Sequence, residues 1–290
     1  MDRAALLSRL DSGFLVASGA NGSLLQAAGL PAGHCPDAWN LEQPAQVELL
    51  ARRYREAGAD LLKTNTFRAN RITLEAWGLA DQASELNQAG VRLARAGAGD
   101  GALIAGNLGP TGKLLAPLGD FPPEAAREAF REQAQALAAA GADLLLVETM
   151  YSLDELRLAV EAAAATGLAV LATMTFERHG RTMMGVSPQD LATLLRHGAA
   201  GVGHNCGDLD LDQVLHLVAR LVAAAQGAPV VVQPNAGIAR LESGQVVYPE
   251  SPQSMALWAK RYLEAGARVI GACCGSTPEH IRALAAALRA

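Results

Sequence analysis

A short phrase recurs along this chain wherever a helical stretch gives way to a strand-like run. Residues 57–62 read AGADLL, residues 140–145 repeat AGADLL, and residues 265–270 read AGARVI, a looser copy. In each copy a glycine follows an Ala- and Leu-rich stretch of helical period, where a helix commonly ends, and an apolar run begins directly after it. The chain is therefore built from repeated helix–glycine–strand units.

Strand-like runs alternate with helical segments from one end of the chain to the other. Eight of them are found, at residues 14–17, 60–63, 103–105, 143–147, 169–173, 201–203, 230–232 and 268–271. Eight such units, with no linker or shift in composition between them, predict an α/β fold, a (β/α)8 TIM barrel formed by one domain over residues 1–290. A doubly wound open sheet is the structural alternative.

Polar motifs follow the carboxyl ends of the predicted strands. They are SGANG at 18–22, TNTF at 64–67, GNLGP at 106–110, ET at 148–149, NC at 205–206, PNAG at 234–237 and CCG at 273–275. In barrel enzymes this face carries the active site. We therefore expect the functional residues among these motifs.

Three of the four cysteines stand in these motifs, Cys206 after one strand and the adjacent Cys273 and Cys274 after the last. Three thiols from two distant strand ends predict a Zn²⁺ site with one coordination position left open, as in catalytic zinc sites. Adjacent side chains in a strand point to opposite faces, so both members of the pair can be ligands only if the strand ends or bulges there. Gly271 and Gly275 allow that.

Two further side chains have to be weighed against this site. His204 shares a strand face with Cys206, and as a fourth ligand it would close the site into a structural one. A histidine that lines the barrel beside the metal is the favoured interpretation. Cys35 lies in a loop rich in Pro and Gly without a partner motif, so we expect it to pack as a small apolar residue.

The chemistry of such a site follows from its ligands. A free thiol has a pKa of about 8.5 and is mostly protonated at neutral pH, whereas coordination to zinc deprotonates it. Three anionic ligands leave the metal a weak Lewis acid towards carbonyl groups. The site therefore suits alkylation of a thiol better than hydrolysis.

Bulk properties exclude several classes of partner. The formal net charge is −5 and no basic run is present, which disfavours nucleic acid and anionic membranes. Four cysteines in 290 residues do not form a disulfide framework, and the apolar run at 14–17 is too short for a signal peptide. No stretch has the length and apolarity of a membrane span. We expect a soluble, cytoplasmic protein.

Nearly the whole chain resembles the homocysteine S-methyltransferase family, the zinc barrels that make methionine. The matching runs are GANGS at 19–23, WNL at 39–41, KTNTF at 63–67, GPTG at 109–112, VET at 147–149, GRT at 180–182, NC at 205–206, PNAG at 234–237 and GACCGSTPEH at 271–280. The last run is very specific, and the glycine-rich runs would be weak alone. By this likeness Cys206, Cys273 and Cys274 are the zinc ligands, and the thiolate of homocysteine takes the fourth position.

The resemblance also implies how the substrate is held. Glu148 looks like the carboxylate that receives the substrate ammonium, a role that a charge-assisted hydrogen bond at a barrel mouth can fill; a solvated glutamate at a strand end is the alternative. Backbone N–H groups around Gly19 and Ala20 are expected to bind the substrate carboxylate, as glycine-rich turns bind anions. Ser18 stands where the family usually has aspartate, which removes a charge near the amino-acid pocket and bears on substrate orientation and identity.

Three asparagines complete the predicted substrate site. Asn65, Asn205 and Asn235 each follow a predicted strand. A polar contact with the substrate and a role in bracing the loops are equally supported for each.

The methyl donor stays open between a small molecule and a corrinoid protein. A quaternary ammonium donor such as betaine needs an aromatic cage. Trp39 matches one wall seen in betaine-using relatives, but Arg68 and Thr149 stand where those relatives carry tyrosines, which disfavours betaine. The TNTF run resembles the homocysteine module of cobalamin-dependent methionine synthase, in which case a corrinoid would arrive on a separate protein. S-methylmethionine and S-adenosylmethionine are the other candidates.

Three other functions compete with this one. A barrel lyase or hydrolase would use Mg²⁺ or Mn²⁺ with oxygen and nitrogen ligands and would tolerate Cys206→Ser. A zinc-dependent amino-acid binder or sensor would bind homocysteine without turnover. A methyltransferase for another small thiol would share the metal site and differ in its substrate contacts.

Overall fold

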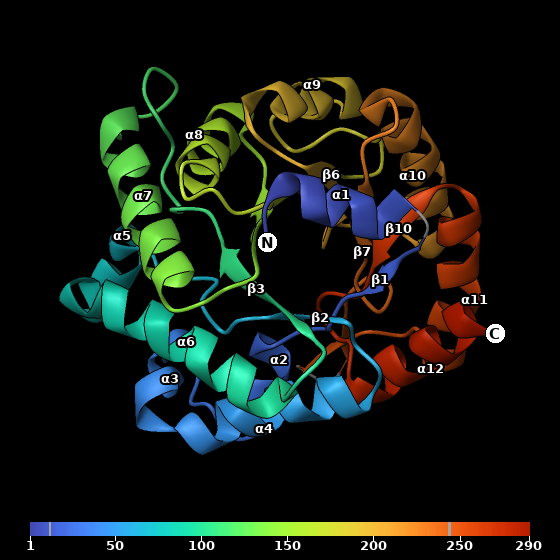
Figure 1. Ribbon diagram of the computed structural model, residues 1–290, viewed down its shortest axis with the longest axis horizontal. Helices are drawn as coiled ribbons and strands as arrows, with labels where there is room; N and C mark the ends of the chain where they lie inside the picture. Colours follow the sequence, from blue (N-terminus) through green and yellow to red (C-terminus); the bar gives the residue numbers. More distant parts are fainter. Residues whose placement is uncertain (12, 243–244) are drawn as a thin grey trace.

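Eight parallel strands form one continuous sheet in the computed structural model, which describes residues 1–11, 13–242 and 245–290. The order across the sheet is β1-β10-β7-β6-β5-β4-β3-β2. The strands are β1 (Leu15–Val16), β2 (Leu61–Lys63), β3 (Leu103–Leu108), β4 (Leu144–Met150), β5 (Val170–Met174), β6 (Gly201–Asn205), β7 (Val230–Gln233) and β10 (Ala267–Ile270). From β2 to β10 the strands of this sheet follow one another in chain order, and β1 lies next to β10. Consecutive βα units have this order when they wind around a barrel (Figure 1).

The sheet closes on itself between β1 and β2. Ala17 forms a parallel bridge with Leu61. The Ser18 amide donates to the Leu61 carbonyl oxygen at 2.8 Å, and the Asp60 amide donates to that of Val16 at 2.8 Å. These bonds join the two ends of the strand order, so the sheet is a closed barrel. The doubly wound open sheet is therefore wrong.

Helices surround the barrel and connect its strands. They are α2 (Gly22–Ala27), α3 (Trp39–Glu42), α4 (Pro44–Glu56), α5 (Arg71–Leu74), α6 (Ala83–Ala98), α7 (Pro123–Ala139), α8 (Leu153–Ala164), α9 (Pro188–Ala192), α10 (Leu211–Ala225), α11 (Pro252–Glu264) and α12 (Pro278–Arg289). Short 3₁₀ turns occur at Pro36–Ala38, Glu75–Trp77, Ala80–Gln82 and Thr193–His197. None of the helices in the described part of the chain has both the length and the apolarity needed to cross a membrane.

The glycines of the recurring phrase end their helices in the predicted way. Gly58, Gly141 and Gly266 have φ angles of 97°, 93° and 107°, in the left-handed region that favours glycine. All eight predicted strands are present, with ends that differ from the prediction by up to three residues. The TIM-barrel prediction is confirmed.

A helix that the sequence analysis did not predict closes the amino-terminal end of the barrel. Helix α1 (Arg3–Asp11) lies across the strands in Figure 1. Its Leu6 and Leu10 are buried in one apolar cluster with inward-facing strand residues such as Leu61, Leu144 and Val231. A second, larger cluster fills the space between the strands and the outer helices. The barrel interior is thus a packed core with α1 as its plug.

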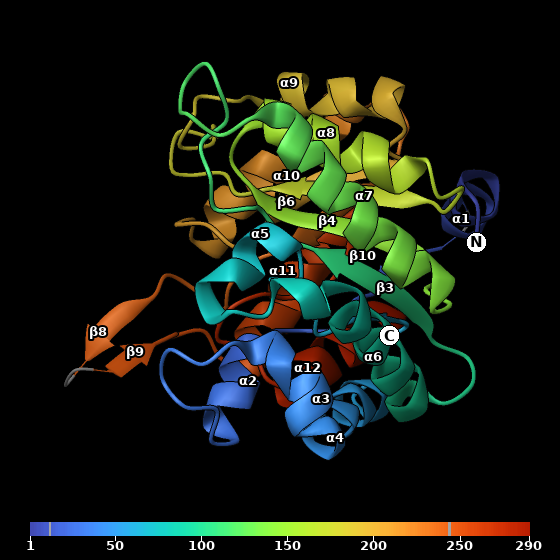
Figure 2. The same cartoon turned by 90° about the vertical axis from the view of Figure 1, so that its left-hand side faces the viewer.

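A two-stranded hairpin, β8 (Arg240–Glu242) and β9 (Gln245–Val247), projects from the opposite end (Figure 2). It lies in the loop between β7 and α11 and was not predicted, because its strands are short and the side chains of β8 are exposed. The loop after β7 also carries Asn235 and Tyr248, so the hairpin rises from the same end of the barrel as the predicted site.

Replacing Leu6 by alanine tests the plug. The side chain is fully buried against the inner strands, so its truncation leaves a cavity and should lower the free energy of unfolding by about 2–5 kcal/mol. Chemical denaturation measures this change. Leu257→Ala, at a side chain that is 69% exposed on α11, is the matched control and should change stability by less than about 0.5 kcal/mol. Equal effects of the two substitutions would contradict the role given to α1.

Candidate metal centre

The sulfur atoms of Cys206, Cys273 and Cys274 converge at the carboxyl end of the barrel, all within 4.8 Å of one another. Cys206 Sγ lies 3.7 Å from Cys274 Sγ, and Cys273 Sγ lies 4.0 Å from Cys274 Sγ. Tetrahedral coordination with metal–sulfur bonds of about 2.3 Å places two sulfurs about 3.8 Å apart. A disulfide requires about 2 Å. The spacing therefore fits three ligands of one metal ion.

Local backbone geometry turns Cys206 towards the other two thiols. Strand β6 ends at Asn205, and Cys206 has a φ angle of 60°, followed by Gly207 at 85°. The left-handed conformation is costly for a residue with a side chain, by about 1–3 kcal/mol, and is found mostly at functional sites. The Cys206 amide donates to the Gln233 carbonyl oxygen at 3.1 Å, which ties this turn to β7.

The adjacent cysteines can both face Cys206 because the strand has already ended. Strand β10 stops at Ile270, so the alternation of side chains does not extend to Cys273 and Cys274. The Cys273 amide donates to the Pro234 carbonyl oxygen at 2.8 Å. Gly275 follows with a φ angle of 77°, and a Cβ atom there would lie 2.2 Å from the Tyr248 ring. The requirement that the strand end before the pair is thus met.

Two asparagines form hydrogen bonds to the cysteines and to the loops that carry them. Asn235 accepts a hydrogen bond from the Cys274 amide at 3.1 Å and donates one to the Gly207 carbonyl oxygen at 3.0 Å, which links the two ligand-bearing loops. Asn205 donates to the Thr149 hydroxyl at 2.7 Å and, at 3.9 Å, to Cys273 Sγ. These hydrogen bonds are those that the predicted bracing role requires, and a contact with the substrate stays a prediction for both residues.

The three thiols also shift one another's pKa values. Hydrogen bonds from Cys206 and Cys273 lower the pKa of Cys274 to about 3, against the effect of its burial. The same contacts, together with burial, raise the pKa of Cys206. The contacts among the three sulfurs thus favour the thiolate form at Cys274 and the thiol form at Cys206.

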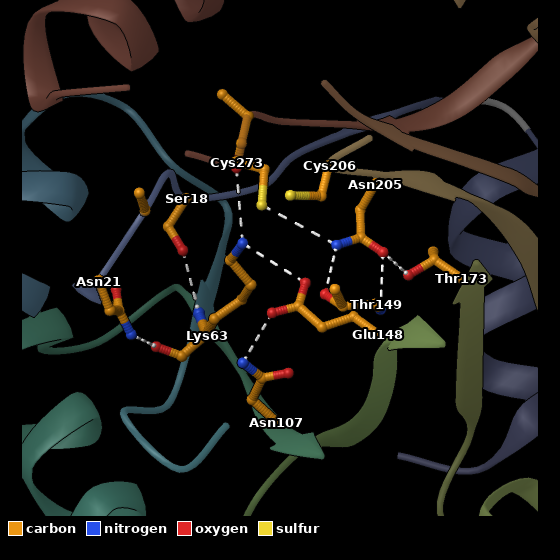
Figure 3. Close-up of polar contacts among 12 residues, drawn as sticks. Ser18, Asn21, Lys63, Asn107, Glu148, Thr149, Thr173, Asn205, Cys206 and Cys273 are labelled. Atoms are coloured by element: carbon orange, nitrogen blue, oxygen red, sulfur yellow. Dashed lines mark hydrogen bonds and ion pairs between the residues drawn. The ribbon is translucent and has the colours of Figure 1, made fainter. Parts of the chain in front are cut away.

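A buried ion pair lies beside the sulfurs (Figure 3). Lys63, at the end of β2, places Nζ 3.6 Å from Glu148 Oε2 in β4, and both side chains are almost fully buried. Burial disfavours the charge on Lys63, but Glu148 and the nearby thiolates outweigh it and raise the lysine pKa. Burial raises the pKa of Glu148, while Lys63 and a 2.8 Å hydrogen bond from Asn107 oppose that rise. Glu148 is therefore not a solvated residue at a strand end.

Lys63 was missed as a site residue, although its run KTNTF was noted for its resemblance. The available signal was a lysine that directly continues the apolar run of a predicted strand. A lysine in a strand that is buried on both faces needs an oppositely charged or hydrogen-bonding partner. The sequence does not show which residue that partner is.

The other predicted substrate residues, at Ser18, in the turn after it and at Asn65, lie at the same end of the barrel and form hydrogen bonds within the protein. Ser18 is buried, and its hydroxyl accepts a hydrogen bond from the Lys63 amide at 3.1 Å. The Ala20 amide, in the turn that begins at Gly19, donates to the Ser276 hydroxyl at 3.1 Å. Asn65 donates to the carbonyl oxygen of Pro36 at 2.8 Å and thus braces the loop after α2.

A sequence profile described as homocysteine S-methyltransferase matches residues 15–288 of this chain. The chain belongs to the homocysteine S-methyltransferase family. Members of this family are methyltransferases.

Individual relatives agree with this assignment. The chain is 33% identical to the methionine synthases of Mycobacterium leprae and Mycobacterium tuberculosis over 98% of its own length, but it spans only 25% of theirs. Crystal structures of the homocysteine methyltransferase MmuM from Escherichia coli superpose with TM-scores of 0.81 for the oxidised form and 0.80 for the metallated form, at 27% identity. Each alignment covers at least 96% of this chain and 98% of MmuM.

Within this family site, His204 and Cys35 stand apart from the thiols. His204 is fully buried in β6, where its Nδ1 accepts a 3.4 Å hydrogen bond from the Phe176 amide, and burial lowers its pKa to about 4. Its ring nitrogens are not part of the group within 4.8 Å. Cys35 is buried in a small apolar cluster with Ala38 and Leu74, and burial raises its pKa to about 11.

Replacing Asn235 by alanine tests the bracing of the ligand loops. The substitution removes both the acceptor for the Cys274 amide and the donor to Gly207, so the affinity for Zn²⁺, used as the probe, should fall about 10- to 100-fold. Competition with a chromophoric chelator measures it. Gln82→Ala, at an exposed position, should leave the affinity unchanged. An unaltered affinity in Asn235→Ala would show that the loops hold the thiols without this link.

Proposed function

We propose that this protein is a homocysteine S-methyltransferase that forms methionine with a zinc ion held by Cys206, Cys273 and Cys274. The observation that carries the proposal is the tetrahedral spacing of three thiols at the carboxyl-terminal mouth of a barrel of this family. Sulfur ligands in this geometry favour zinc among the common divalent metals. When bound, the ion would keep the acceptor thiol deprotonated at neutral pH.

The protein's own residues hold the reactants. Glu148 is the acceptor for the substrate ammonium, and its Oε2 atom is buried without a hydrogen-bond partner among the described residues. Asn205 and Asn235 keep the cysteines in place, so the geometry of the centre need not reorganise during the reaction. In the transfer, the acceptor thiol loses its proton, its sulfur forms a bond to the methyl carbon, and the bond from that carbon to the donor breaks with its electron pair on the donor.

The donor is the part of the reaction that these residues leave open. The methionine synthases that the chain resembles are about four times as long as it is, whereas the match to MmuM covers 98% of MmuM. A donor carried by a corrinoid protein and a small sulfonium donor such as S-methylmethionine or S-adenosylmethionine are both consistent with the site. We place the reaction in the cytoplasm, because free thiols of this kind persist in a reducing compartment.

A donor screen tests the proposed reaction. Purified zinc-loaded protein with homocysteine is offered methylcobalamin, S-methylmethionine, S-adenosylmethionine or betaine in turn, and methionine is followed by mass spectrometry. We expect methionine from a sulfonium or corrinoid donor and none from betaine, because the aromatic cage that betaine needs is incomplete. Homocysteine binding without methionine from any of these donors would indicate a binder or sensor instead.

Serine substitutions test the ligand set. Cys206→Ser, Cys273→Ser and Cys274→Ser should each abolish both zinc retention and methionine formation, since a hydroxyl is a poor replacement for a thiolate ligand. Cys35→Ser is the matched control and should retain one zinc per chain, measured by atomic absorption. Stoichiometric zinc in any one of the first three variants would remove that cysteine from the proposed site.

A further inference from the structure

A side-chain amide inside the barrel donates a hydrogen bond to one of the three sulfurs. Asn205, at the end of β6, is fully buried, and its Nδ2 donates to Cys273 Sγ at 3.9 Å (Figure 3). Among the described residues, no side chain other than a cysteine forms a hydrogen bond with Cys206 Sγ. The sulfurs of Cys273 and Cys206 therefore differ in their surroundings.

The orientation of the Asn205 amide is settled by its other hydrogen bonds. Its Oδ1 accepts from the Thr149 backbone N–H at 2.8 Å and from the Thr173 hydroxyl at 2.7 Å. Because a backbone N–H can only donate, the amide oxygen has to face it. The NH₂ group then faces the Thr149 hydroxyl, at 2.7 Å, and Cys273 Sγ. One of its two protons is thus directed at the sulfur.

A residue with an unfavourable backbone conformation contributes to this arrangement. Thr149 has a φ angle of 65°, which a β-branched residue rarely adopts. In this conformation both its backbone N–H and its hydroxyl contact the Asn205 side chain. Such conformations persist where the surrounding structure enforces them and are found mostly at functional sites. The strain therefore points to a function for the placement of the Asn205 amide.

In the proposed reaction the three cysteines and the acceptor thiol would share one metal ion, and the methyl group has to reach the acceptor. A cysteine that took it would form a sulfur–carbon bond, while the bond from that carbon to the donor broke with its electron pair on the donor. The resulting neutral thioether would be a poor zinc ligand. A hydrogen bond to a thiolate lowers its pKa, and the nucleophilicity of a thiolate falls with its pKa. A donor aimed at a ligand sulfur thus makes that sulfur less reactive.

We propose that Asn205 is a positioning residue that protects Cys273 from methylation by donating a hydrogen bond to its sulfur. The inference rests on the proposed zinc centre and thiol methylation, and it adds a reason why the acceptor takes the methyl group. Cys273 follows Ala272, whose carbonyl oxygen lies 3.5 Å from Lys63 Nζ, so this ligand is close to the Lys63–Glu148 pair. An acceptor thiol held at Glu148 would lie beside Cys273, which makes this sulfur its direct competitor.

Alkylation of the zinc-loaded protein, mapped to single cysteines, tests the inference without homocysteine or a methyl donor. Iodoacetamide reacts with a cysteine by forming a bond from sulfur to carbon, and iodide leaves with the electron pair. The reaction is stopped at low conversion, before a second cysteine of the same chain reacts. Peptide mass spectrometry then gives the ratio of alkylation at Cys273 to that at Cys206, and fragment spectra separate Cys273 from Cys274.

Asn205→Leu removes the donor at similar side-chain size and should raise the Cys273 to Cys206 ratio about 3- to 10-fold, the effect of one hydrogen bond. A general loosening of the site would raise both rates and leave the ratio unchanged. Thr173→Val is the matched control, since it removes a donor to Asn205 Oδ1 and keeps the donor to sulfur. It should change the ratio by less than about 2-fold. An unchanged ratio in Asn205→Leu, or an equal rise in Thr173→Val, would overturn the inference.

Zinc content and thermal unfolding are measured for every variant. If Asn205→Leu does not fold or retain zinc, because the Thr149 N–H and the Thr173 hydroxyl have lost their acceptor, Asn205→Asp replaces it. The carboxylate keeps this acceptor and has no proton to donate to sulfur. The ratio should again rise at least about 3-fold, and an unchanged ratio would reject the inference. Wild-type protein that retains no zinc would instead reject the proposed metal centre and, with it, the proposed function.

Discussion

Hydrogen bonds between β1 and β2 close the sheet, and the arrangement of the site depends on that closure. In the strand order β2 lies at one end, whereas β10, which leads to Cys273 and Cys274, lies next to β1 at the other. In an open sheet five other strands would separate β2, which carries Lys63, from β10. Closure leaves only β1 between β2 and β10, so the Lys63 ammonium reaches the carbonyl oxygen of Ala272. The closed barrel is therefore what brings the charged pair to the thiols.

Two of the three described non-glycine residues with a positive φ angle lie at this end of the barrel. Thr149 and Cys206 both adopt positive φ angles, and Asn205 connects them through its hydrogen bonds to Thr149. At the other end, the packing of α1 against the inner strands forms an ordinary apolar core. This division matches the usual one in barrels, where the amino-terminal face serves stability and the carboxyl-terminal face carries the chemistry.

A buried lysine–glutamate pair is not in itself a stabilising feature. Removing two charges from water costs several kcal/mol per ion, and the mutual attraction repays this only when the remaining hydrogen bonds are satisfied. Here the 3.6 Å separation and the unpartnered Glu148 Oε2 leave the pair incomplete.

Much of the molecule follows from local sequence patterns. The recurring helix–glycine–strand phrase fixes the unit of the barrel, because only glycine readily adopts the left-handed conformation at Gly58, Gly141 and Gly266. The cysteines at two strand ends identify their common role, since parallel strands of a barrel bring their carboxyl ends together. Helix α1 and the β8–β9 hairpin did not follow, because neither belongs to the repeating unit.

The sequence by itself determined a βα barrel with three thiols at one mouth, because hydrophobic period, glycine position and cysteine spacing are all local properties of the chain. Only the tertiary structure decided that Lys63 pairs with Glu148, that Ser276 occupies the Ala20 amide, and that Asn235 links the two ligand loops. Each of these contacts joins residues at least 28 positions apart in the sequence. Their partners are set by strand register and barrel closure, which no local pattern encodes.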